Sequence, residues 1–259
     1  MKKVLFLALI ILRVGLPIPY SGQETLLLES RTLKTELFKT TLSETRIPIL
    51  MYHYVRNVDP NQDSLGWRLS ISPEKFEQQL AYLKQENYKT IHLSDLHRGY
   101  VPEKSIILTF DDGLIDFYTT AFPLLQKYGF TASAAIIENN IGHPQHMNLD
   151  QLKDIHSAGI EIISHTLTHP DLSKLSYENA DKEIRESKKI ADLFQTQSFV
   201  YPAGKYNHQT IKILQGNEYS IALTTQPGIA NLKTNNYLEL PRVRIDNRDS
   251  MDDFKRKII

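Results

Sequence analysis

Short apolar runs alternate with longer helical patterns along the chain from Ile47 onward. Between the runs, apolar residues recur at helical spacing at about residues 117–128, 149–158, 176–194 and 208–216. The runs are predicted strands and read IPILMYH, YKTIHL, SIILTF, TASAAII, IEIIS, SFVYP, YSIALTT and YLELPRVRI. Strands that alternate with helices need crossover connections, so the pattern predicts an α/β domain with a parallel sheet, either covered on both faces or closed into a barrel.

A further helix is predicted to begin at residues 72–74, where the sequence reads Ser-Pro-Glu. Serine is a favoured cap, proline is tolerated in the first turn, and an acid suits the positive end of a helix. The apolar residues that follow share one face: Phe76, Leu80 and Leu83. Residues 56–71 show no regular period and are predicted to form an irregular insertion, where Trp67 suits either a cleft border or the edge of the core.

The first 22 residues read MKKVLFLALIILRVGLPIPYSG. Basic residues, an apolar run and small residues follow one another in the order of a signal peptide. The run of nine apolar residues is too short to span a bilayer, although a permanent anchor is the alternative. We therefore expect a signal peptide at 1–22, a linker or arm at 23–45 and one domain at 46–259. The mature protein is expected to be exported, without a stable membrane span.

Composition limits the kinds of partner. The 259 residues include 30 basic and 30 acidic side chains, so the chain lacks the broad positive field that nucleic-acid binding needs. It contains no cysteine, which excludes disulfides and thiolate ligands. Any bound metal ion must therefore be held by histidine, aspartate or glutamate.

Two carboxylates, Asp111 and Asp112, stand side by side where the run SIILTF ends. Acids at a strand end are most often turn or cap residues, so the pair alone does not define a site. In parallel α/β proteins, however, functional sites lie at the carboxyl ends of strands. A bound cation would offset the repulsion between the two acids and let one act as a ligand and the other as a general base.

His165 and His169 follow the run IEIIS at a spacing of four residues. In a continuing strand they would be ~13 Å apart at ~3.3 Å per residue, too far to share an ion. The threonines and the proline around them favour a tight turn that brings both imidazoles to one point. Two imidazoles and a carboxylate from Asp111 or Asp112 form a three-ligand site of the catalytic zinc type, which also suits cobalt, nickel or iron.

The motifs TFDDG and SHTLTH resemble those of polysaccharide deacetylases of the NodB-homology type, carbohydrate esterase family 4. The two motifs occur in the family's order, and the resemblance spans roughly residues 46–246. It implies an irregular (β/α)7 barrel and hydrolysis of N-acetyl groups from an amino-sugar polysaccharide with a divalent metal ion. It also implies that Asp111 is the base and that the metal ligands are Asp112, His165 and His169.

The stretch YPAGKYN resembles the family's third motif, usually R-x-P-Y-G, which lines the substrate cleft. Val200 stands where the family has the arginine that orients the base, and Ala203 where tyrosine is common. For the two tyrosines of the stretch, stacking on a sugar and packing in the core are equal alternatives. The predicted cleft residues are Tyr201, Pro202, Ala203, Gly204 and Tyr206.

The stretches ILMYHYV and LPRVRID resemble exported deacetylases of poly-β-1,6-N-acetylglucosamine, a biofilm polymer. In that subgroup a histidine of the first strand lies in the cleft, and His53 is the matching residue. We expect His53 to protonate the leaving amine, with a purely structural hydrogen bond as the alternative. Arg242 is expected to replace the missing arginine beside Asp111, with Arg244 left open. The predicted substrate is this polymer; peptidoglycan, chitin oligomers, acetylated xylan and a non-catalytic sugar-binding role are the alternatives.

Overall fold

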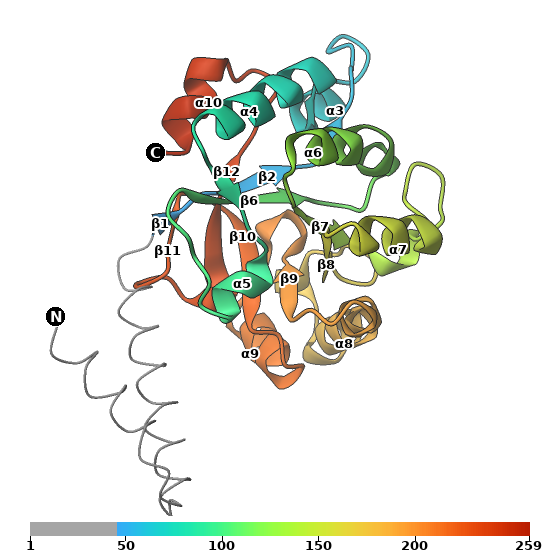
Figure 1. Ribbon diagram of the computed structural model, residues 1–259. Coiled ribbons are helices and arrows are strands. Elements are labelled where there is room, and N and C mark those ends of the chain that lie inside the picture. The colour runs from blue at the N-terminus through green and yellow to red at the C-terminus, as the bar shows by residue number, and fades with distance from the viewer. Residues whose placement is uncertain (1–45) are drawn as a thin grey trace, which may run out of the picture. The chain divides into compact units, whose positions relative to one another are not determined.

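The computed structural model describes residues 46–259, which form a closed barrel of parallel strands (Figure 1). Every neighbouring pair around the barrel is parallel, and β2 pairs with both β6 and β12, which closes the ring. The α/β class and the irregular seven-stranded barrel are confirmed. The seven barrel strands are β2 (Ile49–Tyr52), β6 (Ser105–Phe110), β7 (Ser133–Ile136), β8 (Glu161–Ser164), β9 (Ser198–Val200), β10 (Ile221–Pro227) and β12 (Leu240–Arg244).

The barrel strands are mostly apolar because both of their faces are buried. All six residues of β6 are buried, and so are all four of β7 and of β8. One face fills the barrel and the other packs against the surrounding helices. The pleat still sets the direction of each side chain: Phe110 packs outward against Phe76 and Phe117, so the next residue, Asp111, points toward the barrel axis.

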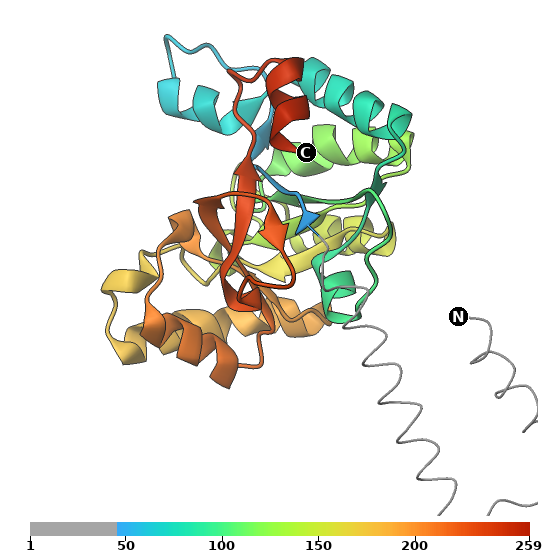
Figure 2. The ribbon, with the colours of Figure 1, turned by 90° about the vertical axis from the view of Figure 1, so that its left-hand side faces the viewer.

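Helices surround the barrel (Figures 1 and 2). Those of seven residues or more in the described chain are α4 (Pro73–Gln85), α6 (Phe122–Tyr128), α7 (Leu149–Ser157), α8 (Tyr177–Leu193), α9 (His208–Gly216) and α10 (Met251–Lys257). Four of the predicted helical stretches coincide with α6, α7, α8 and α9. The first of them starts as a π-helical turn, Phe117–Ala121, before α6.

The helix predicted to begin after Ser72 is α4. The Ser72 hydroxyl accepts a hydrogen bond from the backbone N–H of Lys75, and the proline occupies the first turn. The predicted apolar face is buried against the barrel: Phe76, Leu80 and Leu83. Local capping and tertiary packing therefore agree on where this helix starts and which way it faces.

The prediction of an irregular insertion at residues 56–71 is wrong for its second half. This part forms the short helix α3 (Ser64–Leu69), and the Asp63 carboxylate caps it by accepting from the backbone N–H of Gly66 at 2.7 Å. Gly66 conceals the helical pattern in the sequence. A Cβ there would lie 2.0 Å from a carboxylate oxygen of Asp63, so a larger residue would displace the side chain that caps this helix.

Short elements complete the described chain. β1 (Arg46–Ile47) pairs antiparallel with β11 (Ala230–Asn231), β3 (Tyr54–Val55) pairs with β4 (Ser70–Ile71), and β5 (Lys89–Thr90) pairs with the start of β6. The remaining helical segments are α5 (Leu93–His97) and the 3-10 turns Glu138–Asn140, Leu172–Lys174, Pro202–Gly204 and Tyr237–Glu239.

Within residues 46–259, none of the helices has the length and apolarity needed to cross a membrane. The predicted signal peptide at 1–22 and the predicted linker or arm at 23–45 lie outside the described residues.

Candidate active site

Polar side chains from four barrel strands or the turns after them meet at one end of the barrel. They form two adjacent groups, a buried ion pair and a cluster of three metal-type donors. A histidine after β2 lies beside the ion pair. The side chains are Asp111, Asp112, His165, His169, Arg242 and His53.

Asp111 and Arg242 form a buried bidentate ion pair. Nη1 of Arg242 donates to Oδ1 and Nη2 donates to Oδ2, each at 2.8 Å. Nη1 also donates to Oγ1 of Thr109 at 3.0 Å, and Nε donates to the Thr224 carbonyl oxygen at 2.8 Å. The guanidinium group is fully buried, and two parallel hydrogen bonds fix the plane of the carboxylate as well as its charge.

Arg242 is thus the arginine that contacts Asp111, and Arg244 is exposed. The two residues lie two positions apart on β12, so their side chains leave the same face of the strand. Arg244 stands one residue pair closer to the carboxyl end, where its neighbour in the register is Met51 on β2. Arg242, which lies further from the carboxyl end of β12, is the one whose guanidinium group reaches both Asp111 and the Thr224 carbonyl oxygen.

The pKa of Asp111 lies well below its usual range. Burial by itself raises the pKa of this carboxyl group, but the charge and hydrogen bonds of Arg242 outweigh it, and His53 and His165 lower it further. Asp111 is therefore ionised at neutral pH, which is the state that a general base requires.

We predict that Arg242→Met lowers the free energy of unfolding by about 3–5 kcal/mol, because it leaves the Asp111 carboxylate buried without its partner. Urea unfolding measures this loss. Arg244→Met is the matched control and should change stability by less than about 0.5 kcal/mol, since Arg244 is exposed. Because folding lowers the pKa of Asp111, the ion pair stabilises fully above the unfolded-state pKa of about 3.9, and the difference from wild type should shrink as the pH falls below it. Equal stability of the two variants at neutral pH would contradict this account of the pair.

Asp112, His165 and His169 place three donor atoms around one point. Oδ1 of Asp112 lies 3.4 Å from Nε2 of His165 and 3.6 Å from Nε2 of His169. Two ligands about 2.0–2.2 Å from a tetrahedral ion are themselves about 3.4 Å apart, so these spacings fit one divalent ion. Within residues 46–259 this is the one group of three His, Asp or Glu side chains with donor atoms this close, all within 4.8 Å of one another.

A tight turn after β8 brings the two imidazoles together, with ring centroids 4.8 Å apart. Thr166 and His169 both adopt left-handed backbone angles, with φ of +68° and +63°, and Oγ1 of Thr166 accepts from the His169 N–H. Asp112 is left-handed as well, with φ of +76°. Such angles cost non-glycine residues about 1 kcal/mol or more, and they persist where surrounding contacts enforce them. Here Glu183 on α8 accepts hydrogen bonds from both the N–H and the hydroxyl of Thr168.

The backbone of Val200 orients the first imidazole. Nδ1 of His165 donates to the Val200 carbonyl oxygen at 2.8 Å, and because a carbonyl only accepts, the proton lies on Nδ1. Nε2 is then the atom directed at Asp112. A hydrogen bond of this kind is the usual device for aiming a metal-binding histidine. This contact could not be predicted from the sequence, because every residue type has a backbone carbonyl group.

His53 lies beside the ion pair, with Nε2 3.9 Å from Oδ2 of Asp111. Its side chain is 15% exposed, so one edge of the ring reaches the open end of the barrel. Burial lowers the pKa of His53, and the nearby Asp111 and Asp112 offset this only in part. Its protonated form is therefore a stronger acid than an ordinary histidine.

The two tyrosines of the third motif pack against each other. Tyr201 is fully buried, its hydroxyl donates to the Leu238 carbonyl oxygen, and its ring stacks on Tyr206 with centroids 4.3 Å apart. Tyr206 is half-buried and donates to the Glu239 carboxylate at 3.0 Å. Tyr201 is thus a core residue whose ring is not open to a sugar, contrary to its placement among the cleft residues.

Pro202, Ala203 and Gly204 form a tight turn after β9. Pro202 is buried, whereas Ala203 is exposed and left-handed with φ of +49°. Gly204 also has positive φ, and a Cβ there would lie 2.1 Å from Oγ1 of Thr225. The close packing of Gly204 fixes the turn, so Ala203 presents its backbone at the surface.

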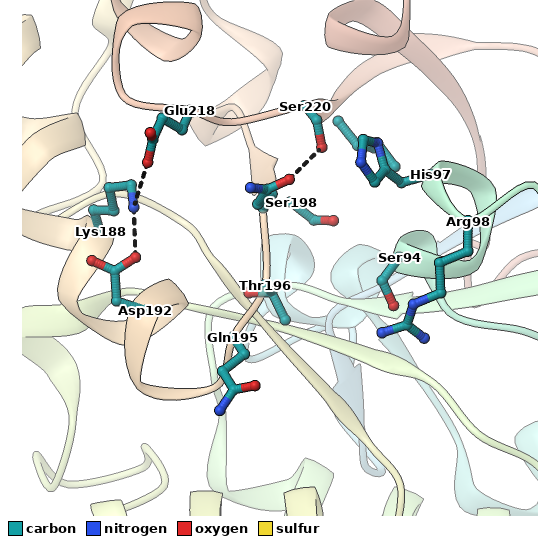
Figure 3. A pocket seen from close by; sticks show the side chains of 12 residues that line it. Ser94, His97, Arg98, Lys188, Asp192, Gln195, Thr196, Ser198, Glu218 and Ser220 are labelled. Atoms are coloured by element: carbon teal, nitrogen blue, oxygen red, sulfur yellow. Dashed lines mark hydrogen bonds and ion pairs between the residues drawn. The ribbon is translucent and has the colours of Figure 1, made fainter. Parts of the chain in front are cut away.

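A polar hollow of about 400 Å³ lies at the opposite end of the barrel, at the starts of β9 and β10 (Figure 3). Lys188 forms ion pairs there with Asp192 and Glu218 at 2.5 and 3.8 Å. None of the six side chains of the candidate site lines this hollow. It is therefore separate from the candidate active site.

Two further histidines, His143 and His146, lie in the loop before α7. Both are outside the three-donor cluster. The ring of His146 bonds within its own loop, to the side chain of Asn140 and the carbonyl of Pro144. The structure therefore does not place either histidine among the possible metal ligands.

A parallel barrel with an Asp-His-His cluster beside a separately paired carboxylate is the arrangement expected from the resemblance to polysaccharide deacetylases. The sequence profile of the polysaccharide deacetylase family matches residues 98–222. The Bacillus subtilis protein YxkH, assigned by its name to the polysaccharide deacetylases, is 34% identical over 219 residues, which cover 82% of this chain and 75% of that protein. The chain belongs to the polysaccharide deacetylase family.

Two further relatives extend the comparison. The Streptococcus pyogenes deacetylase PplD, solved in complex with acetate, is 32% identical with a TM-score of 0.78, covering 83% of this chain and 99% of that one. The poly-β-1,6-N-acetyl-D-glucosamine N-deacetylase of Staphylococcus epidermidis is 27% identical over 230 residues, 76% of this chain and 78% of that protein. The family profile covers Asp111, Asp112, His165 and His169, whereas His53 and Arg242 lie outside its match.

Proposed function

We propose that this chain hydrolyses N-acetyl groups of an amino-sugar polysaccharide and releases acetate, with poly-β-1,6-N-acetylglucosamine as the leading substrate. The observation that carries the proposal is that the two adjacent acids have different partners: Asp111 pairs with Arg242, whereas Asp112 faces His165 and His169. The named activity of the Staphylococcus epidermidis relative supports the choice of polymer.

Asp112, His165 and His169 are proposed to hold a divalent ion, zinc before cobalt, nickel or iron, which when bound polarises the acetyl carbonyl and lowers the pKa of a water molecule. Asp111, kept ionised by Arg242, takes the proton of the attacking water. Arg242 is enclosed and acts through Asp111, so it is a positioning residue. A backbone N–H near Ala203 is proposed to donate to the oxyanion, by resemblance to the family.

Cleavage of an amide also needs an acid, because the nitrogen leaves poorly unless it is protonated. His53 is proposed to supply this proton. It lies within 4 Å of Asp111 and reaches the open end of the barrel, where the leaving group would stand. Its lowered pKa favours release of the proton once the imidazole is protonated.

We predict that His53→Ala lowers kcat about 10²- to 10⁴-fold with the metal retained, because it removes the proton donor and no ligand. Acetate release and metal content are measured on the same preparation. His143→Ala, at an exposed loop histidine outside the cluster, is the control and should keep full activity. Near-normal turnover of His53→Ala would remove His53 from the mechanism.

A panel of substrates tests the choice of polymer. We expect faster acetate release from β-1,6-linked N-acetylglucosamine oligomers than from β-1,4-linked oligomers, peptidoglycan fragments or acetylated xylan. Activity confined to the acetyl ester would overturn the N-deacetylase assignment. Binding of the oligomers without acetate release at any metal ion would favour a non-catalytic sugar-binding role.

We also propose that the mature protein is exported, on the basis of the signal-like pattern in residues 1–22. Expression of the full chain in a bacterial host should give a processed protein that starts near residue 23, as read from its intact mass. A full-length product that stays with the membrane fraction would instead favour an uncleaved anchor.

A further inference from the structure

A third acid, Asp116, follows the paired acids and directly precedes the π-helical turn Phe117–Ala121. An aspartate at such a position usually caps its own helix by accepting from a backbone N–H within the first turn. The side chain of Asp116 makes no capping hydrogen bond of this kind. Its Oδ2 accepts instead from the backbone N–H of Val55 at 2.5 Å, although the two residues are 61 positions apart. The carboxylate therefore joins the acid-bearing turn after β6 to the chain that follows β2.

A second hydrogen bond joins the same two segments on the other side of His53. The backbone N–H of Asp111 donates to the Tyr52 carbonyl oxygen at 3.0 Å. Tyr52 directly precedes His53, and Val55 follows His53 by two positions. His53 is thus flanked by two hydrogen bonds, and both of them come from the short stretch that runs from Asp111 to Asp116.

His53 itself belongs to no strand. β2 ends at Tyr52, β3 begins at Tyr54, and β3 pairs with β4 rather than with a barrel strand. The last register pair between β2 and β6 is that of Tyr52 with Phe110. The ladder of the barrel therefore stops just before His53, and beyond this residue the Asp116 carboxylate ties the chain to the acid-bearing turn.

The placement of His53 matters for the proposed mechanism. Its Nε2 lies 3.9 Å from Oδ2 of Asp111, and its side chain is 15% exposed at the open end of the barrel. A general acid works only within hydrogen-bond reach of the atom that it protonates. A displacement of about 1 Å at a reacting group costs about 100-fold in rate. A contact that fixes the backbone beside His53 therefore has a direct effect on turnover.

From these observations we propose that Asp116 is a positioning residue, which fixes the backbone after His53 so that the imidazole faces the leaving amine. The inference rests on the proposed deacetylase function and on the role of His53 as proton donor. Asp116 is not among the three clustered donors, and its carboxylate acts through the N–H of Val55.

The test compares Asp116→Ala and Asp116→Asn in acetate release from β-1,6-linked N-acetylglucosamine oligomers. Asp116→Ala removes the acceptor, so kcat should fall about 10- to 100-fold with KM and metal content unchanged. Asp116→Asn keeps a side-chain carbonyl oxygen that accepts from the same N–H, and its kcat should stay within about threefold of the wild type. A loss as large as that of Asp116→Ala would overturn the inference, because the hydrogen bond would then not be the cause.

Asp95→Ala is the matched control. Oδ2 of Asp95 also accepts from a backbone N–H, that of His92 at 2.9 Å. Asp95 lies on α5, and other residues of this helix line the hollow at the opposite end of the barrel. Loss of the same kind of hydrogen bond there should leave kcat at the wild-type value.

A second background separates positioning from general support of the fold. Because Asp116 acts through His53, Asp116→Ala should cause no further loss of kcat when His53 is already alanine. The same factor of loss in the wild-type and His53→Ala backgrounds would overturn the inference. Circular dichroism shows whether each variant is folded. If Asp116→Ala does not fold, Asp116→Glu takes its place with the same expected results, since it keeps the charge and displaces the acceptor by one methylene group.

The outcomes distinguish this inference from the proposed function. If the wild type releases acetate and Asp116→Ala equals it, the positioning role is overturned and the deacetylase function stands. Near-normal turnover of His53→Ala likewise overturns the positioning role alone. If the wild type releases no acetate from any oligomer with any ion, the deacetylase function fails, and the positioning role fails with it.

Discussion

Asp111→Asn should lower the kcat for acetate release about 10²- to 10⁴-fold. A carboxamide cannot take the proton of the attacking water, whereas Asp112, His165 and His169 remain in place to hold the ion. Acetate release and bound metal are measured on the same purified sample. The expected result is therefore loss of turnover with unchanged metal content.

Asp154→Asn is the matched control for this variant. Asp154 lies on α7, outside the three-donor cluster, and its carboxylate accepts a hydrogen bond from the Tyr118 hydroxyl. The same loss of charge there should leave turnover within about twofold. Turnover of Asp111→Asn within tenfold of wild type would show that another group takes the proton.

Substitution of any one of the three clustered donors should remove the metal. Asp112→Ala, His165→Ala and His169→Ala each leave two donors, and we expect the affinity for the ion to fall more than about 100-fold, because loss of an outer-shell partner alone costs 10- to 100-fold. Activity should be lost in parallel. Metal content after dialysis, measured by mass spectrometry, gives the result directly.

His146→Ala is a suitable control for the histidine variants, since His146 bonds within its own loop and lies outside the cluster. Asp111→Asn serves as a control for Asp112→Ala, because it changes the adjacent acid, which lies outside the three-donor cluster. Unchanged metal content in all three cluster variants would mean that the metal site has been assigned to the wrong residues.

The order of strands and helices was predictable because a parallel barrel buries both faces of each strand. The run SIILTF has no polar alternation and forms β6, with all six residues buried. The proximity of the paired acids to the two histidines follows from the same fact, since the carboxyl ends of parallel strands meet at one end of the barrel. The helix inside residues 56–71 was missed because its Gly66 serves close packing against Asp63 rather than helix propensity.

The choice between Arg242 and Arg244 required three-dimensional information. Both side chains leave the same face of β12, and the sequence contains no signal for how far along the barrel axis each one lies. The register of β10 and β12 is irregular between Leu223 and Pro227, and the Thr224 carbonyl in this stretch accepts from Nε of Arg242. A local register shift of this kind depends on the assembled sheet.

Contacts made by backbone atoms were likewise out of reach of sequence reasoning. Val200 occupies the position where the family motif has an arginine, and its side chain gives no sign of a role. Its backbone carbonyl oxygen nevertheless orients His165. Tyr201 was placed in the cleft by its position in a motif, but its side chain points into the core and bonds the Leu238 carbonyl. The direction of a side chain in a tight turn depends on its neighbours, which the motif alone does not specify.

The most direct test of the account is acetate release from β-1,6-linked N-acetylglucosamine oligomers while metal-free protein is titrated with zinc, cobalt or nickel. We predict no release without an ion, and a rise that ends at one ion per chain for the wild type and is absent for His165→Ala. Full release by the metal-free protein, or no release with any ion, would contradict the central claim that Asp112, His165 and His169 hold the metal of a polysaccharide deacetylase whose base is Asp111.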